Sequence, residues 1–200
     1  MNVLLSSTYF GPVQWYQKLY RAEVSMIEQY DSFIKQTYRN RCVIATANGT
    51  QALTVPVERD GSMLMKDIRI SDHGNWRHVH WNAISSAYGD SPFFEYYADD
   101  LRPFFEERWE RLLDFNMAIT RKMCELLDIR PDIRLTASYE KAGCLGEDFR
   151  EIIHPKHPGM DADFLPRPYY QVFGQRYGFL PNLSVLDLLF NMGPESIFYL

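Results

Sequence analysis

The chain has 200 residues, of which 46% are hydrophobic and 15% aromatic, enough to bury one good core, so we expect a single domain over residues 1–200. Its 26 acidic and 21 basic residues give a formal net charge of -5. That balance argues against wholesale nucleic-acid binding, because neutralising phosphates requires a broad basic face. The N-terminus lacks the pattern of a signal peptide, and no stretch approaches the ~18 apolar residues that span a bilayer. A cytoplasmic protein without membrane insertion is therefore expected.

The three cysteines, Cys42, Cys124 and Cys144, are odd in number and lack the spacing of metal ligands. We therefore expect neither a disulfide framework nor a zinc site. His78 and His80 would resemble metal ligands only on a strand, and their surroundings favour a helix. No glycine-rich phosphate loop or Ser-His-Asp signature is visible, so the sequence identifies no cofactor.

The first forty residues predict a β-α-β unit. The apolar run "NVLLSS" is typical of a short strand, and Val13, Tyr16 and Leu19 follow Pro12 at helical spacing. The segment "EVSMIEQYD" then alternates as a second strand does, which favours a parallel pair.

Asn48-Gly49 predicts a β-hairpin, because this dipeptide supplies the two positive φ angles of a type I′ turn. Placing it at the centre of the turn pairs Ile44 with Leu53. The alternation along both strands then defines a buried face. That face carries Cys42, Ile44, Leu53, Val55 and Val57.

Further along, "MLMKDIRI" indicates another strand, and a helix follows with Trp76, His80 and Ile84 on one stripe. Another helical region begins after Pro92. Apolar residues then recur every three or four positions over residues 105–126, which predicts a long amphipathic helix with Asn116 on its buried stripe.

"DIRLTASYE" has strand character again, and residues 154–170 contain four prolines and form a surface connection. Ser184 and Asp187 resemble a capping box before a last helix that Gly193 ends. The expected fold is therefore α/β or α+β. It has an N-terminal β-α-β unit and an Asn-Gly hairpin in a mixed sheet, packed by a long amphipathic helix.

The stretch "KQTYRNR" holds three cations and no anion within seven residues. If it is extended, Lys35, Arg39 and Arg41 project from one face, with the two guanidinium stems about 7 Å apart, a spacing suited to a pair of phosphates. The alternative is an edge strand that uses its cations to prevent aggregation. Both interpretations stand at this point.

Three more positions have a structural and a functional interpretation. His80 faces inward, either as a buried histidine bonded to a carbonyl or as a general base. Asn116 must find hydrogen-bond partners and either ties a helix to a sheet or lines a pocket. Asp187 and Asn191 lie one helical turn apart and can share a ligand, although capping also explains Asp187.

The blocks "TYFGPVQWYQKL", "YDSFIKQTYRNRCVI", "LTVPV" and "PNLSVLDLLFNMGPES" resemble the WbqC-like family over about residues 6–198. The resemblance implies a role in O-antigen or related surface-polysaccharide biosynthesis, with transfer of glycine or another acyl group to an amino sugar. His80, as a general base, and Tyr88 are our catalytic candidates, and both occupy positions of the family's motifs. The substrate-binding candidates are Lys35, Tyr38, Arg39, Asn40, Arg41, Trp76, Asp187 and Asn191.

Our leading hypothesis is a transferase that acts on a nucleotide-activated sugar, with Arg39 and Arg41 holding phosphate and His80 as the base. The competing hypothesis is a non-catalytic ligand-binding or assembly protein of a polysaccharide pathway. Both imply a small anionic ligand, a nucleotide sugar or a phosphate. A pocket in which His80 and Tyr88 converge near the arginines would favour the enzyme, and a flat basic face would favour the binding protein.

Overall fold

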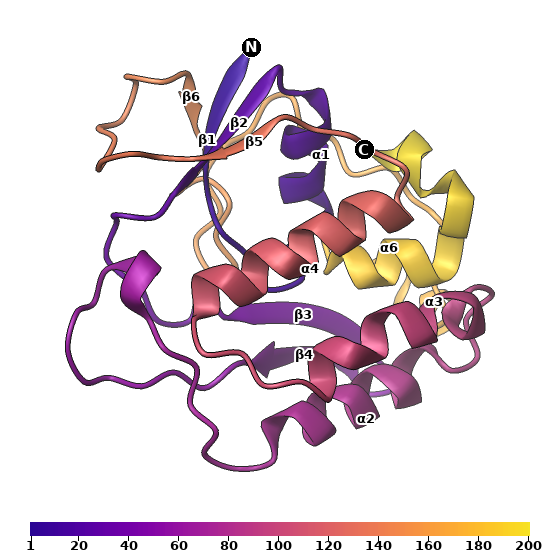
Figure 1. Ribbon diagram of the computed structural model, residues 1–200. Coiled ribbons are helices and arrows are strands. Elements are labelled where there is room, and N and C mark those ends of the chain that lie inside the picture. Colours follow the sequence, from indigo (N-terminus) through magenta and orange to yellow (C-terminus); the bar gives the residue numbers. More distant parts are fainter.

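Two sheets organise the protein, which a computed structural model describes over residues 1–200 (Figure 1). One sheet has four parallel strands in the order β5-β2-β1-β6, and the other is the antiparallel pair β3-β4. The α/β fold class is confirmed. We expected a single mixed sheet, whereas the hairpin forms a sheet of its own. The strands are β1 (Asn2–Ser6), β2 (Val24–Glu28), β3 (Arg41–Thr46), β4 (Gly49–Thr54), β5 (Ile133–Leu135) and β6 (Glu147–Asp148).

The predicted β-α-β unit is confirmed. Helix α1 (Val13–Arg21) follows Pro12 and joins β1 to β2, which lie side by side with Asn2 opposite Val24. Apolar side chains of α1 pack into the core, where Trp15 and Tyr16 are almost fully buried. The parallel strands bring the ends of β1 and β2 to the same edge of the sheet.

The hairpin exists, but its register differs from the predicted one by two residues. Cys42 pairs with Leu53, and the two-residue turn is Ala47-Asn48, with Gly49 (φ 103°) as the first residue of β4. Since side chains alternate with a period of two, a shift of two residues keeps every side chain on its predicted face. The buried positions are confirmed for Cys42, Ile44, Leu53 and Val55, whereas Val57 is half-buried.

The helices cover the two sheets, and the helix predicted after Trp76 is confirmed. Ser184 caps the last long helix, because its Oγ accepts from the Leu186 N–H, and Gly193 (φ 54°) follows the end of that helix. None of the helices is both long and apolar enough to cross a membrane. The helices are α2 (Trp76–Tyr88), α3 (Phe94–Leu101), α4 (Leu112–Leu126), α5 (Gly174–Tyr177) and α6 (Val185–Met192), with 3₁₀ turns at Met65–Asp67, Arg102–Phe105 and Gly193–Tyr199.

Two predicted elements are wrong, and they share one cause. Residues 63–70 form no strand, and α4 begins at Leu112 instead of residue 105. The Ile70 N–H donates to the Glu110 carbonyl and the Leu112 N–H to the Ile68 carbonyl, both at 2.9 Å. These contacts between distant segments straighten the chain just before α4, so the helical spacing of residues 105–111 does not produce a helix.

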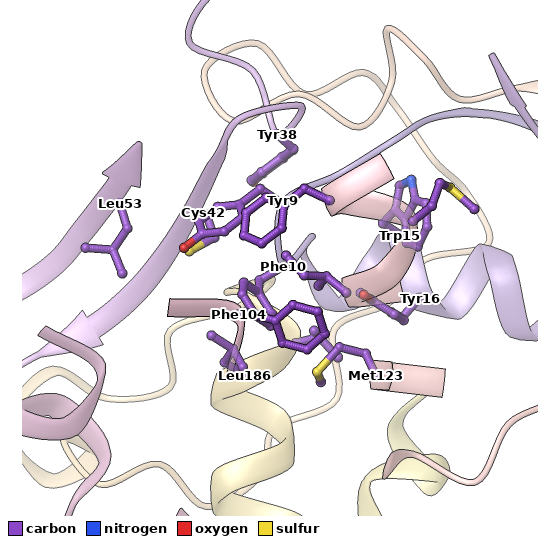
Figure 2. Packing of buried hydrophobic residues seen from close by; sticks show 14 of the residues in the cluster. Tyr9, Phe10, Trp15, Tyr16, Tyr38, Cys42, Leu53, Phe104, Met123 and Leu186 are labelled. Atoms are coloured by element: carbon purple, nitrogen blue, oxygen red, sulfur yellow. The ribbon is translucent and has the colours of Figure 1, made fainter. Parts of the chain in front are cut away.

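Helix α4 lies between the parallel sheet and the hairpin in Figure 1, and α2 packs against β3. Tyr9 and Phe10, which follow β1, sit at the centre of the core, with Cys42 of β3 and Met123 of α4 close by (Figure 2). The prediction that Asn116 is buried and hydrogen-bonded is confirmed. Its amide bridges the two sheets, because it contacts Ser7 after β1 and Arg39 before β3.

Candidate functional site

Three basic side chains and no acidic one line a pocket of about 300 Å³ beside the start of the hairpin. The basic residues are Lys35, Arg41 and Arg59, and we call this hollow the basic pocket. None of the three forms an ion pair with a carboxylate. Its walls also include Asn40 and the apolar side chains Phe33, Pro56 and Met63.

Arg41 is held in place by the hairpin. It is the first residue of β3 and lies opposite Thr54, whose Oγ1 accepts a 3.0 Å hydrogen bond from the Arg41 Nε–H. The two terminal nitrogens of the guanidinium remain free to bind a ligand. Such a fork grips oxygen atoms of a phosphate in pairs, whereas a lysine offers a point charge.

Asn40 supplies a buried acceptor to the same pocket. Its Nδ2–H donates to the Val55 carbonyl, and the Val55 N–H donates to the Asn40 carbonyl, both at 2.8 Å. The residue is 5% exposed, and its Oδ1 is buried without a hydrogen-bond partner. An unsatisfied buried acceptor costs about 1–3 kcal/mol, and this oxygen is shielded from solvent, so a ligand can satisfy it only after the Asn40 side chain moves.

Arg39 does not share the face of Arg41, which corrects the predicted arrangement. Gln36 has a left-handed backbone (φ 60°), and residues 36–40 turn before β3 begins, so the stretch from Lys35 to Arg41 is not extended. Arg39 is 3% exposed and forms an ion pair of 2.5 Å with Asp31. It faces a different hollow.

That second hollow lies where the parallel strands end. It has a volume of about 530 Å³, and we call it the sheet-edge cleft; its polar lining includes Asp31, Arg39, Asp148 and Arg150. The Arg150 guanidinium contacts Asp148 at 2.6 Å. Burial raises the pKa of the Asp31 carboxyl, and the Arg39 guanidinium opposes that rise. Ligands of α/β proteins commonly bind beyond the carboxyl ends of parallel strands.

His80 lines neither hollow. It is 4% exposed, its Nδ1 lies 2.8 Å from the Tyr9 hydroxyl, and its ring packs edge-on against Trp76. Burial lowers the pKa of His80 to about 4, so its imidazole is neutral at pH 7. The two predicted site residues His80 and Trp76 therefore lie together, outside the linings of the basic pocket and of the hollow that Arg39 faces, and the Arg77 guanidinium lies 4.5 Å over the Trp76 ring.

Tyr88, Asp187 and Asn191 form another buried group. The Asp187 carboxylate accepts from the Tyr88 hydroxyl at 2.9 Å, the Tyr169 hydroxyl at 2.7 Å and the Gln171 Nε2–H at 2.9 Å. The interpretation of Asp187 as a cap is wrong, because its side chain points into this network. The Asn191 Nδ2–H donates to the Asp187 carbonyl, and burial raises the pKa of the Asp187 carboxyl.

The predicted site residues are thus divided among separate places. Lys35, Asn40 and Arg41 line the basic pocket, whereas Arg39 lines the sheet-edge cleft. Tyr38 is buried, and its carbonyl accepts from the Tyr9 N–H. His80 and Tyr88 do not converge near the arginines, so the arrangement expected of the enzyme hypothesis is not present.

Sequence reasoning missed Arg59 and all the sheet-edge residues other than Arg39. Arg59 lies in irregular chain after β4, where no periodic pattern relates it to Lys35. The other missed residues lie at or just after the ends of strands of the parallel sheet: Asp31, Asp148 and Arg150. The one sequence signal for a site there was that β2 ends in polar residues. No group of three or more His, Cys, Asp or Glu side chains is arranged to hold a metal ion.

Comparison with known proteins gives one family match. The profile described as the WbqC-like protein family matches residues 7–155, a span that contains the linings of both hollows. A protein of Mycobacterium tuberculosis (strain ATCC 25618 / H37Rv), named "Uncharacterized protein Rv1507c", is 29% identical over 197 aligned positions. That alignment covers 84% of this chain and 83% of the relative. No solved structure matches the chain significantly.

Proposed function

The chain belongs to the WbqC-like protein family, and from this premise we propose a cytoplasmic transferase that acts on a nucleotide-activated amino sugar in surface-polysaccharide biosynthesis. The group transferred in this proposal is glycyl or another acyl group. The nucleotide sugar binds through its phosphates in the basic pocket. Lys35, Asn40 and Arg41 keep the binding roles expected from the sequence, and Arg59 joins them.

One observation carries the binding part of the proposal: Lys35, Arg41 and Arg59 surround one pocket that has no acidic residue in its lining. The transfer reaction itself rests on the family resemblance. The chain as a whole is acidic, with a formal net charge of -5. A local cluster of unpaired cations therefore creates a positive potential on an otherwise negative protein and attracts anions to the basic pocket. A diphosphate has oxygens enough to contact the Arg41 fork and both other cations.

The remaining walls suit the other parts of a nucleotide. Met63, which is 38% exposed, offers an apolar surface to a base. A volume of about 300 Å³ is at the lower end of the range for small-molecule sites, which extends from about 300 to 1,000 Å³.

A second candidate function is favoured by the same lining. The basic pocket has no carboxylate, imidazole or thiol that can take a proton from a nucleophile, and His80 and Tyr88 lie outside it. This composition is that of a binding site without catalytic machinery. We therefore retain the alternative of a non-catalytic ligand-binding or assembly protein of the same pathway.

Calorimetric titration with UDP-N-acetylglucosamine tests the binding that both candidates share. Arg41→Lys keeps the charge and loses the fork, so we expect affinity to fall about tenfold. The free energy of unfolding should change by no more than about 0.5 kcal/mol, because Arg41 lies at the mouth of a pocket. The matched control is Arg121→Lys, since Arg121 is exposed on α4 far along the chain. Equal affinities in the wild type and Arg41→Lys would rule out the basic pocket as the phosphate site.

Mass spectrometry separates the transferase from the binding protein. The wild type is incubated with the nucleotide sugar and either an acyl-CoA or an aminoacyl donor. An acylated or glycylated sugar that Arg41→Lys forms more slowly supports the enzyme. Binding without any product for either donor class supports the alternative.

A further inference from the structure

The sheet-edge cleft has no part in the proposed function, yet it is built as a site. Two largely buried ion pairs line it, Arg39 with Asp31 and Arg150 with Asp148. Arg150 also approaches Glu28 to 3.5 Å, and Glu28 is completely buried at the end of β2. These contacts fix both guanidinium groups at the edge where the parallel strands end.

Several polar atoms of this cleft lack partners. Asp31 is 8% exposed and Arg39 is 3% exposed, and both Asp31 Oδ1 and Arg39 Nε are buried without a hydrogen bond. A recess of about 10 Å³ shares Arg39 and Arg150 with the cleft and reaches Ser6 and Thr8, whose hydroxyls are also unpartnered. Asp31 and Arg39 of the cleft lining thus hold one unsatisfied carboxylate oxygen and one unsatisfied guanidinium N–H, and the two unsatisfied hydroxyls lie in the recess. All four atoms are shielded from solvent, so a ligand reaches them only when a lining side chain moves.

The charges of the lining are largely paired with one another. Asp31 and Asp148 neutralise Arg39 and Arg150, and Glu151 adds a further carboxylate to the same cleft. An anion therefore finds no unpaired cation here, which favours a neutral ligand. A neutral hydroxyl both donates and accepts, so neighbouring hydroxyls on a ring can serve the free oxygen and the free N–H together.

We propose that the sheet-edge cleft binds a small neutral polyhydroxylated ring, a sugar or a cyclitol. Its hydroxyls donate to Asp31 Oδ1 and accept from the Arg39 Nε–H. Tyr139, which is 57% exposed, lines the cleft with the Arg150 guanidinium 5.5 Å over its ring, and its uncovered surface can contact the apolar C–H side of the ligand. This site goes beyond the proposed function, because it needs neither the basic pocket nor a phosphate.

Nuclear magnetic resonance on the full chain tests the proposal. The probes are glucose, galactose, mannose and myo-inositol, titrated to high millimolar concentration, and the signal followed is the Arg39 Nε–H. We expect at least one probe to shift this signal, and the comparison of hexoses with the cyclitol identifies the ring chemistry. Glucose 6-phosphate, the charged counterpart of glucose, should shift the Arg39 signal less than glucose does.

Two variants place the ligand. Asp31→Asn removes the acceptor charge, and we expect the dissociation constant to rise at least tenfold. Asp31→Asn leaves Arg39 without its ion pair and can fail to fold, so a second variant, Ile34→Trp, is needed. Ile34 lines the cleft and is 42% exposed, so the larger tryptophan side chain should fill part of the cleft without disturbing the core. Thermal unfolding checks that Ile34→Trp is folded.

The outcomes distinguish this proposal from the preceding one. The inference is overturned if none of the four probes shifts the Arg39 signal, if Ile34→Trp responds as the wild type does, or if only the phosphorylated sugar binds. Arg41→Lys should leave the response to neutral rings unchanged. Loss of nucleotide-sugar binding in that variant concerns the basic pocket alone, so either proposal can fail without the other.

Discussion

Arg39 and Arg41 stand two positions apart, yet one is buried in an ion pair and the other lies at the mouth of a pocket. Removing one partner of a buried pair costs about 3–5 kcal/mol, because the other charge remains in the interior. Asp31 therefore determines the position of Arg39 more strongly than strand alternation does. The sequence predicted cations at this place, but it could not show that Asp31 would take one of them.

His80 provides a prediction at the scale of one residue. Its folded pKa is about 4 and its ordinary pKa is 6.5, so the unfolded chain binds a proton more readily than the folded chain between these values. The contribution of this pKa difference to the free energy of unfolding is fully present above pH 6.5 and is lost as the pH falls towards 4. We expect the free energy of unfolding to fall by about 3 kcal/mol over this range.

Urea unfolding of the wild type and of His80→Gln measures this effect. The measurements run from pH 7.5 down to pH 4 in steps on the order of one pH unit. Glutamine keeps a polar partner for the Tyr9 hydroxyl and does not titrate in this range. The wild type should lose more stability on acidification than His80→Gln. Parallel curves would show that His80 is as easily protonated in the folded chain as in the unfolded one.

At the scale of elements, prediction succeeded where the pattern is local. The β-α-β unit, the hairpin faces, α2 and the end of α6 each depend on residues a few positions apart. The start of α4 and the irregular path of residues 63–70 depend on hydrogen bonds between distant segments, on which sequence spacing carries no information, so these two predictions were wrong. The register of the hairpin was wrong for a local reason, because the turn consists of Ala47-Asn48 instead of Asn48-Gly49.

Strand β6 was not predicted at all, and it supplies Asp148 to the sheet-edge cleft. Its approach to β1 depends on Gly146, which has φ 133° and where a Cβ would collide with the Asn2 carbonyl. We expect Gly146→Ala to lower the free energy of unfolding by at least about 3 kcal/mol and to weaken binding of neutral rings.

Gly143→Ala is a matched control for this effect. Gly143 lies in the same loop and also has a positive φ, of 83°, but a Cβ added there would meet nothing within 4 Å, so only the backbone cost of about 1–2 kcal/mol applies. Chemical denaturation gives both values. Equal losses in the two variants would mean that contact with β1 does not constrain Gly146.

For the whole molecule, Asn116 joins the two sheets through α4. Its Nδ2–H groups donate to the Arg39 carbonyl at 2.7 Å and to the Ser7 Oγ at 3.2 Å. Ser7 follows β1 and Arg39 precedes β3, so one amide connects the parallel sheet, the central helix and the hairpin. The sequence indicated such a tie from a single polar residue on an apolar stripe, although it could not name the partners.

Asn116→Leu should lower the free energy of unfolding by about 2–3 kcal/mol, because the Arg39 carbonyl is left buried and unsatisfied. Affinity for UDP-N-acetylglucosamine should fall as well, since Asn40 and Arg41 directly follow Arg39. Met117→Leu, a substitution of similar volume on the same helix, should cost less than about 1.5 kcal/mol and leave affinity unchanged. Full affinity in Asn116→Leu would show that the basic pocket does not need this anchor.

The double attachment of Arg39 also has an entropic consequence. Its carbonyl is held by Asn116 and its guanidinium by Asp31, so its rotamer freedom was already lost when the chain folded. A ring bound in the sheet-edge cleft immobilises little more of the protein. Lys35 and Arg59 are exposed, and fixing each costs about 0.5–1.5 kcal/mol in side-chain entropy. In the basic pocket, the electrostatic attraction between ligand and cations must therefore offset that entropy loss. Added salt should weaken binding in the basic pocket more steeply than binding of a neutral ring in the sheet-edge cleft.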